Sequence, residues 1–88
     1  MTDRWVLSIH RRACKELDVL GRSMKARAVA AIDSLSKEPR PRGCTKLRPQ
    51  VETYRLRVGD YRIIYSVSDR DKTVTILWVK HRQGAYKH

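Results

Sequence analysis

The stretch TYRLRVGDYRIIY, residues 53–65, holds two short runs of alternating apolar and polar side chains on either side of Gly59-Asp60. A period of two residues is typical of β-strands, in which successive side chains point to opposite faces. A Gly-Asp pair between two such runs predicts a two-residue hairpin turn, because glycine adopts the backbone angles that such a turn requires. The stretch therefore predicts an antiparallel pair of strands.

The predicted pairing sorts the side chains of this hairpin onto two faces. Val58 faces Tyr61, and each further pair lies one residue farther from the turn. Because side chains alternate along a strand, one face is expected to join the core, and it carries Tyr54, Leu56, Val58, Tyr61, Ile63 and Tyr65. The other face carries Arg55, Arg57, Arg62 and Ile64.

Positive charge crowds this second face of the hairpin. The pairing places Arg57 directly opposite Arg62, and Arg55 lies two residues along the same strand. Like charges opposite each other destabilise a strand pair. An anion held between them would turn the repulsion into attraction, and guanidinium forks match the geometry of phosphate. A solvated sheet face would also be polar, but it would not require arginine at all three polar positions nearest the turn. The hairpin therefore favours a phosphate-binding site.

The whole chain shares this excess of positive charge. Its 88 residues include 20 Lys and Arg against nine Asp and Glu, a formal net charge of +11. A charge of this size on a small surface exceeds what solubility needs, and it favours a nucleic acid or a strongly acidic protein as the partner. The carboxylates are scattered along the sequence, and no cluster of them suits a two-metal nuclease. Neither a metal site nor a cofactor is expected.

The length predicts a single domain over residues 1–88. Cys14 and Cys44 have no metal-ligand spacing and do not make a disulfide framework. The sequence contains no signal peptide and no apolar run approaching ~18 residues, so we expect a cytoplasmic protein that does not contact a membrane.

Before the hairpin, the sequence predicts one strand and two helices. Residues 5–9 read as a strand. A first helix ends at Gly21, and a second is capped by Ser23 and stops at Pro39. Apolar side chains follow at helical spacing, namely Ala13, Leu17 and Leu20 in the first helix and Met24, Ala28, Ala31, Ile32 and Leu35 in the second.

The C-terminal half of the chain predicts a loop and three strands. Residues 39–50 are rich in proline and basic residues and predict a loop, in which residues 44–47 approach the sheet. Strands are expected over 52–58, 61–68 and 73–80, and the last has apolar groups on both faces, as a central strand does. The predicted fold is α+β in the order β-α-α-β-β-β, a mainly antiparallel sheet with a two-helix hairpin packed on one face.

These motifs resemble those of the RelE/ParE superfamily of toxins, in its RelE-like branch. The segments YRLRVGDYRIIYSV and VKHRQGAY resemble the C-terminal half of these proteins. The segments RRACKEL, LGRSMKARAVAAIDSL and KEPRPRGCTKLR resemble their helical hairpin, proline stop and KLR segment. The resemblance covers nearly the whole chain, and the Tyr-Arg hairpin and the HRxxxY tail are its specific part. It implies the RelE-like microbial RNase fold.

The resemblance implies the toxin of a type II toxin–antitoxin system. Such a toxin is a ribosome-dependent mRNA endonuclease, or mRNA interferase, that cuts in the ribosomal A site and inhibits translation. The 2′-hydroxyl of the RNA attacks the adjacent phosphorus without a metal, which leaves a 2′,3′-cyclic phosphate and a 5′-hydroxyl. The implied partners are a cognate acidic or amphipathic antitoxin, mRNA in the ribosome, and operator DNA only for the toxin–antitoxin complex.

The resemblance also implies roles for individual residues. Arg62 and Arg82 would stabilise charge on the phosphoryl oxygens, and Tyr86 would stack on a base, orient the 2′-hydroxyl or transfer a proton. Arg55 and Arg57 would hold flanking phosphates, at positions where the best-known members have lysine, and arginine cannot act as a base there. The other candidate RNA-binding residues are Lys46, Arg48, Lys80 and Lys87.

His81 is a further catalytic candidate, because imidazole exchanges a proton near neutral pH. It neighbours Arg82, however, and adjacent side chains of an extended strand point to opposite faces. His81 can join the arginines only if the strand has ended or bulged at this position.

Two other functions stay open at this point. ParE-like members of the superfamily inhibit DNA gyrase without nuclease activity, and they generally lack the Arg/Tyr set that Arg82 and Tyr86 represent. A basic module that binds nucleic acid without any chemistry is the other alternative.

Overall fold

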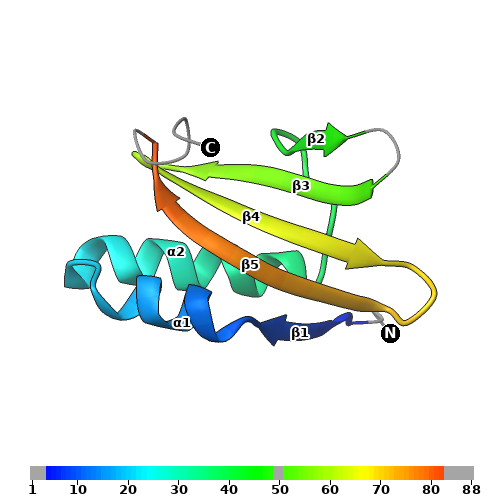
Figure 1. Ribbon diagram of the computed structural model, residues 1–88, viewed down its shortest axis with the longest axis horizontal. Helices are drawn as coiled ribbons and strands as arrows, with labels where there is room; N and C mark the ends of the chain where they lie inside the picture. Colours follow the sequence, from blue (N-terminus) through cyan, green and yellow to red (C-terminus); the bar gives the residue numbers. More distant parts are fainter. Residues whose placement is uncertain (1–3, 49–50, 83–88) are drawn as a thin grey trace.

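The computed structural model describes residues 4–48 and 51–82, which form two helices and five strands (Figure 1). In chain order these elements are β1 (Val6–Ile9), α1 (Arg11–Asp18), α2 (Arg22–Leu35), β2 (Thr45–Arg48), β3 (Val51–Val58), β4 (Tyr61–Ser68) and β5 (Thr73–His81).

The strands form one sheet in the order β1-β5-β4-β3-β2, and both helices lie on the same side of it (Figure 1). β1 runs parallel to β5, whereas the other neighbours are antiparallel. The predicted α+β class, with a helix pair on one face of a mainly antiparallel sheet, is confirmed.

The sheet has one strand more than the sequence predicted. Residues 45–48, expected within a loop, form β2 and pair with β3, with Thr45 opposite Arg55. Gly43, at φ +99°, turns the chain just before this strand. The backbone groups along the outer edge of β3 need hydrogen-bond partners, and the segment after Gly43 supplies them despite its lack of a clear strand pattern.

The predicted register of the β3–β4 hairpin is confirmed at every position. Gly59 makes the turn at φ +59°, in the left-handed region that favours glycine. The observed partners are Val58 with Tyr61, Arg57 with Arg62, Leu56 with Ile63, Arg55 with Ile64 and Tyr54 with Tyr65.

The hydrophobic core lies between this sheet and the helices. Tyr54, Ile63 and Tyr65 of the predicted core face are buried, and the rings of the two tyrosines stack with centroids 5.7 Å apart. The Tyr65 hydroxyl donates to the carbonyl of Pro39 at 2.8 Å, and burial raises the pKa of Tyr65. The helices supply Ala13, Leu17, Ala28, Ile32 and Leu35, while Leu56, Val58 and Tyr61 pack partly buried against the cluster.

The ends of α2 differ from the prediction. Gly21, in extended backbone, precedes its first residue, so Ser23 lies inside the helix rather than capping it. The helix also ends at Leu35, before Pro39 is reached. At this end the Ser36 hydroxyl donates to the carbonyl of Asp33 at 2.7 Å and closes the last turn. Within the described ranges, neither helix is long and apolar enough to span a membrane.

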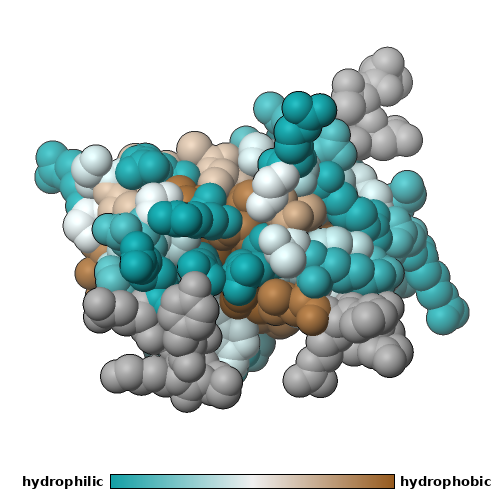
Figure 2. All heavy atoms as spheres, turned by 90° about the horizontal axis from the view of Figure 1, so that it is seen from above, coloured by the Kyte–Doolittle hydropathy of each residue, from teal (hydrophilic) through white to brown (hydrophobic). Residues whose placement is uncertain are grey.

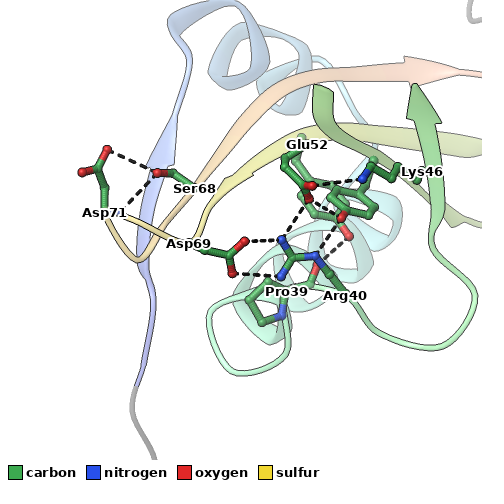
Figure 3. A network of polar contacts seen from close by, with 9 residues as sticks. Pro39, Arg40, Lys46, Glu52, Ser68, Asp69 and Asp71 are labelled. Atoms are coloured by element: carbon green, nitrogen blue, oxygen red, sulfur yellow. Dashed lines mark hydrogen bonds and ion pairs between the residues drawn. The ribbon is translucent and has the colours of Figure 1, made fainter. Parts of the chain in front are cut away.

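Arg40 connects the segment after α2 to two distant parts of the chain (Figure 3). Its guanidinium donates twice to Asp69, in the turn after β4, at 3.2 and 2.7 Å, and once to Glu52 on β3 at 3.0 Å. Its Nε donates to the Tyr54 hydroxyl at 2.7 Å, which in turn donates to Glu52 at 2.5 Å. Hydrogen bonds from Tyr54, Lys46 and Arg40 lower the pKa of Glu52 to about 2, and the bond from Arg40 lowers the pKa of Asp69.

Candidate nucleic-acid interface

Three cations from three strands form a row on the sheet face that points away from the helices. Arg62 on β4 is the cross-strand partner of Arg57 on β3 and of Lys80 on β5. Because neighbouring strands lie about 4.8 Å apart, this cationic row of Arg57, Arg62 and Lys80 spans about 10 Å at the backbone. Figure 2 views the molecule from the side opposite the helices, and hydrophilic residues cover most of that surface.

The members of the cationic row differ in their exposure to water. Arg62 is only 8% exposed, whereas Arg57 is exposed and its Nε donates to the carbonyl of Gly59 at 3.2 Å. Charge interactions strengthen as the local dielectric falls. A phosphate that reached Arg62 would therefore be bound more strongly there than at an exposed arginine.

Glu16 on α1 holds Lys80 in the row from the side. One of its oxygens, Oε1, accepts the backbone N–H of Val79 at 2.7 Å, and Oε2 forms an ion pair with Lys80 Nζ at 2.9 Å. A carboxylate from a helix thus takes the place of a strand partner at this edge of β5. The sequence carries no local signal for this contact, because it depends on how α1 packs against β5.

Arg12, one helical turn before Glu16, contacts the same edge of the sheet. Its Nε donates to the carbonyl of Leu77 at 3.2 Å, and its guanidinium carbon lies 3.2 Å from the centroid of the Trp78 ring. Lys80 Nζ lies 4.7 Å from that centroid. The β4–β5 pairing shifts register here, since Leu77 is an extra residue between two paired positions. Trp78 is thereby placed among cations from β5 and α1.

The other predicted RNA-binding residues do not all share this face. Arg55 does, because its cross-strand partner is Ile64. Lys46 lies opposite Tyr54, on the helix side, and its Nζ forms an ion pair with Glu52 at 3.0 Å. Lys46 therefore belongs to the Arg40 network of Figure 3 rather than to the cationic row.

The C-terminal candidates follow β5. The backbone N–H of Arg82 donates to the carbonyl of Asp60 at 2.7 Å, which ties Arg82 to the β3–β4 turn near Arg57. The predicted roles of Tyr86 and Lys87, and of the Arg48 side chain, lie outside the described residues and side chains.

His81 lies on the opposite face from Arg62, so the condition under which it could join the arginines, an end or bulge of the strand at this position, is not met. β5 continues through His81, whose cross-strand partner is Tyr61, and the two rings meet edge to face with centroids 5.2 Å apart. The register shift in β5 occurs earlier, at Leu77, and leaves this alternation unchanged.

The described part of the chain contains no group of three or more His, Cys, Asp or Glu side chains placed to hold a metal ion. Its open sheet face carries guanidinium, ammonium and indole groups, together with the hydroxyls of Thr53 and Ser66, which pair across β3 and β4.

Comparison with known proteins places this arrangement in a family. The family described as the ParE toxin of the type II toxin-antitoxin system, parDE, has a sequence model that matches residues 7–86. The chain belongs to the RelE/ParE family of toxins. The toxin is 32% identical over 85 residues to the RelE1 protein of Methanocaldococcus jannaschii, a match that covers 93% of this chain and 94% of that protein.

Two solved structures of toxin–antitoxin complexes contain similar chains. One is the RelBE2 complex of Mycobacterium tuberculosis, with 31% identity and a TM-score of 0.78 over 93% of this toxin and 95% of that chain. The other is the archaeal RelE–RelB complex of Pyrococcus horikoshii OT3, with 36% identity and a TM-score of 0.78 over 93% of this toxin and 97% of that chain. The resemblance seen in the sequence motifs is confirmed, and so is the RelE-like fold.

Proposed function

We propose that the toxin is an endoribonuclease that cuts mRNA in the ribosomal A site, in the cytoplasm, and so inhibits translation. In the proposed reaction, the 2′-oxygen of one nucleotide attacks the adjacent phosphorus. A bond from the 2′-oxygen to phosphorus forms as the bond from phosphorus to the 5′-oxygen breaks. The 2′-hydroxyl loses its proton and the departing 5′-oxygen gains one, which leaves a 2′,3′-cyclic phosphate and a 5′-hydroxyl end.

The observation that carries this proposal is the cationic row. The attack builds negative charge on the non-bridging oxygens of the phosphate, and cations already fixed in place stabilise that charge at little reorganisation cost. Arg62, buried and central, is assigned to the scissile phosphate. Arg57 and Lys80 flank it, and Arg55 on the same face is assigned to a neighbouring phosphate.

We assign Arg82 to the phosphoryl charge, in keeping with the hydrogen bond that attaches its backbone N–H to the β3–β4 turn. Proton transfer needs a different residue, because a guanidinium does not act as a base. We assign Tyr86 to stacking on a base, to orientation of the 2′-hydroxyl or to proton transfer. The chemistry proposed for the protein requires no cofactor.

The proposal is tested by mapping mRNA 5′ ends in a cell-free translation extract. The wild-type toxin is expected to produce cut mRNA with 5′-hydroxyl ends. Arg62→Ala should lower the cutting rate about 10²–10³-fold, the usual cost of losing one preorganised charge donor. Arg70→Ala is the matched control, because Arg70 is exposed in the turn at the other end of β4. Intact mRNA with the wild type, or equal losses in the two variants, would count against the proposal.

Inhibition of DNA gyrase is the second candidate, because the matching family is described as the ParE toxin of parDE. A gyrase inhibitor would block supercoiling while mRNA in the same extract stays intact. The supercoiling assay and the 5′-end map, run on one preparation, separate the two functions.

We further propose a cognate antitoxin, acidic or amphipathic, that covers part of the basic surface. The relatives from M. tuberculosis and P. horikoshii were both solved as toxin–antitoxin complexes. The toxin–antitoxin complex, rather than the free toxin, would bind operator DNA. Co-purification with the product of a neighbouring gene would support this partner, and a toxin that is harmless when expressed alone would argue against it.

A further inference from the structure

A hollow beside the cationic row is lined by residues that the proposed reaction does not use. It lies along α1 and is lined by His10, Arg11, Arg12, Lys15 and Glu16. We propose that this α1 hollow binds a second phosphate of the RNA, outside the cationic row. The identity of the ligand as RNA rests on the proposed function, whereas the existence of the site rests on the contacts described next.

Arg12 is held in a fixed position with most of its donors still available. Its Nε is used by the carbonyl of Leu77, and the flat guanidinium lies on the Trp78 ring. Within residues 4–48 and 51–82, no carboxylate forms an ion pair with Arg12. Stacking on an aromatic ring orders the guanidinium and leaves its terminal nitrogens as a planar fork, which suits a phosphate.

The carboxylate in the hollow does not cancel this charge. Both oxygens of Glu16 already have partners, the backbone N–H of Val79 and Lys80 Nζ. Arg11 and Lys15 are exposed, and the part of the chain that the structure describes offers neither of them an ion-pair partner. The hollow therefore keeps a net positive charge from its lining.

The α1 hollow is continuous with the cationic row through one side chain. Lys80 is the cross-strand partner of Arg62, and its Nζ also lies 4.7 Å from the centroid of the Trp78 ring on which Arg12 stacks. A basic surface thus runs from the centre of the sheet across the edge of β5 to α1. An RNA strand whose phosphate lies at Arg62 presents further phosphates at regular intervals, and α1 can hold one of them.

The test measures binding of a short 2′-O-methyl RNA oligonucleotide by fluorescence anisotropy over a range of KCl concentrations. This probe lacks the attacking 2′-hydroxyl, so binding is measured without cleavage. The variants are Arg12→Gln and Lys15→Gln, with Arg70→Gln as the control that removes one equal charge far from α1. Arg12→Lys keeps the charge but loses the planar fork, and its affinity should fall between those of wild type and Arg12→Gln.

We expect Arg12→Gln and Lys15→Gln each to reduce the slope of log affinity against log salt by about 0.7–1, the value for one lost phosphate contact. Arg70→Gln should leave the slope at the wild-type value. In a Trp5→Phe background, addition of the oligonucleotide should change the emission of Trp78, and Arg12→Gln should abolish that change. If circular dichroism shows that Arg12→Gln is not folded, the salt slope of Lys15→Gln tests the proposal in its place.

Equal slopes in the α1 variants and the Arg70→Gln control would overturn the proposal. So would variants that bind the oligonucleotide normally but lose the antitoxin, because α1 would then be a protein-binding surface. Failure of the proposed cleavage is a separate outcome. If the wild-type toxin leaves mRNA intact and the variants show the expected salt slopes, the proposed nuclease activity is refuted and the proposed phosphate site at α1 stands.

Discussion

Arg57 on β3 is the direct cross-strand partner of Arg62 on β4. Such a pairing of like charges destabilises the two strands relative to neutral partners. An anion that lies between the two side chains would make the pairing favourable. The toxin therefore places two like charges on neighbouring strands at the position where the proposed function needs two cations.

This cost predicts that Arg57→Gln stabilises the free toxin and weakens its activity. At low salt the melting temperature should rise by a few degrees, which corresponds to about 0.5 kcal/mol in a domain of this size. The gain should shrink at high KCl, where charges are screened. Thermal melts at two salt concentrations measure the first effect, and 5′-end mapping measures the loss of cutting.

Arg70→Gln is the control for Arg57→Gln, because any loss of positive charge reduces the general repulsion in a chain with a net charge of +11. A similar gain in both variants would show that the Arg57–Arg62 contact carries no special cost.

His81→Gln should leave the cutting rate and its pH profile nearly unchanged. The His81 ring contacts Tyr61 on the helix side of the sheet, whereas Arg62 faces the other side. Loss of a general acid or base costs about 10²–10⁴-fold, so a decrease below about tenfold would place His81 outside the proton transfer. Rates between pH 5 and 9 check this, with Tyr86→Phe as the variant expected to lose activity. A drop of the full size, with loss of one limb of the pH profile, would restore His81 as the catalytic base.

The hairpin could be predicted from the sequence because its geometry is local. The period of two residues and the turn at Gly59 together determine which residues face each other, and the observed pairs agree at every position. The same logic separated the buried Tyr54 and Tyr65 from the arginines of the open face.

The edge of β5 could not be predicted, because it depends on segments far apart in the chain. Glu16 and Arg12 are spaced for an ion pair within the helix, yet Glu16 reaches Val79 and Lys80 while Arg12 reaches Trp78. This arrangement follows from the parallel β1–β5 pairing and the extra residue in β5, neither of which leaves a local pattern.

The ion-pair partner of one basic residue also depends on the fold and could not be predicted. Lys46, a candidate RNA-binding residue, lies on the helix side of the sheet, where its ion-pair partner is Glu52. Glu52 lies six positions after Lys46 in the sequence, and this spacing alone does not predict an ion pair. The two side chains meet because β2 pairs antiparallel with β3.

The Arg40 network predicts a specific loss of stability in acid. The folded pKa of Glu52 is lowered to about 2, below its value of about 4.3 in an unfolded chain. A depressed carboxylate pKa stabilises the fold above the unfolded value, and that stabilisation disappears as the pH falls through the folded value. Asp69 acts in the same direction. Chemical denaturation between pH 7 and pH 2 should show Glu52→Gln losing less stability than wild type below about pH 4.3.

The control for this pH series is Glu38→Gln, since Glu38 is exposed and, in the described part of the chain, forms no ion pair. Its pH dependence should follow that of the wild type. A Glu52→Gln curve parallel to the wild-type curve over the same range would mean that the network contributes no charge-dependent stability.

Glu16 is predicted to position Lys80 rather than to take part in the reaction, and two substitutions separate its two contacts. Glu16→Gln keeps an oxygen to accept the Val79 N–H but loses the ion pair with Lys80, so stability should change little while cutting falls. Glu16→Ala also leaves the Val79 N–H without its acceptor, at a further cost of about 1–3 kcal/mol. Denaturant melts and cutting rates on both variants test this split. The effect of Glu16→Gln should fall on kcat rather than on KM, because Lys80 is proposed to act on developing charge beside Arg62. If Glu16→Gln is as unstable as Glu16→Ala and cuts mRNA at the wild-type rate, Glu16 supports the fold alone.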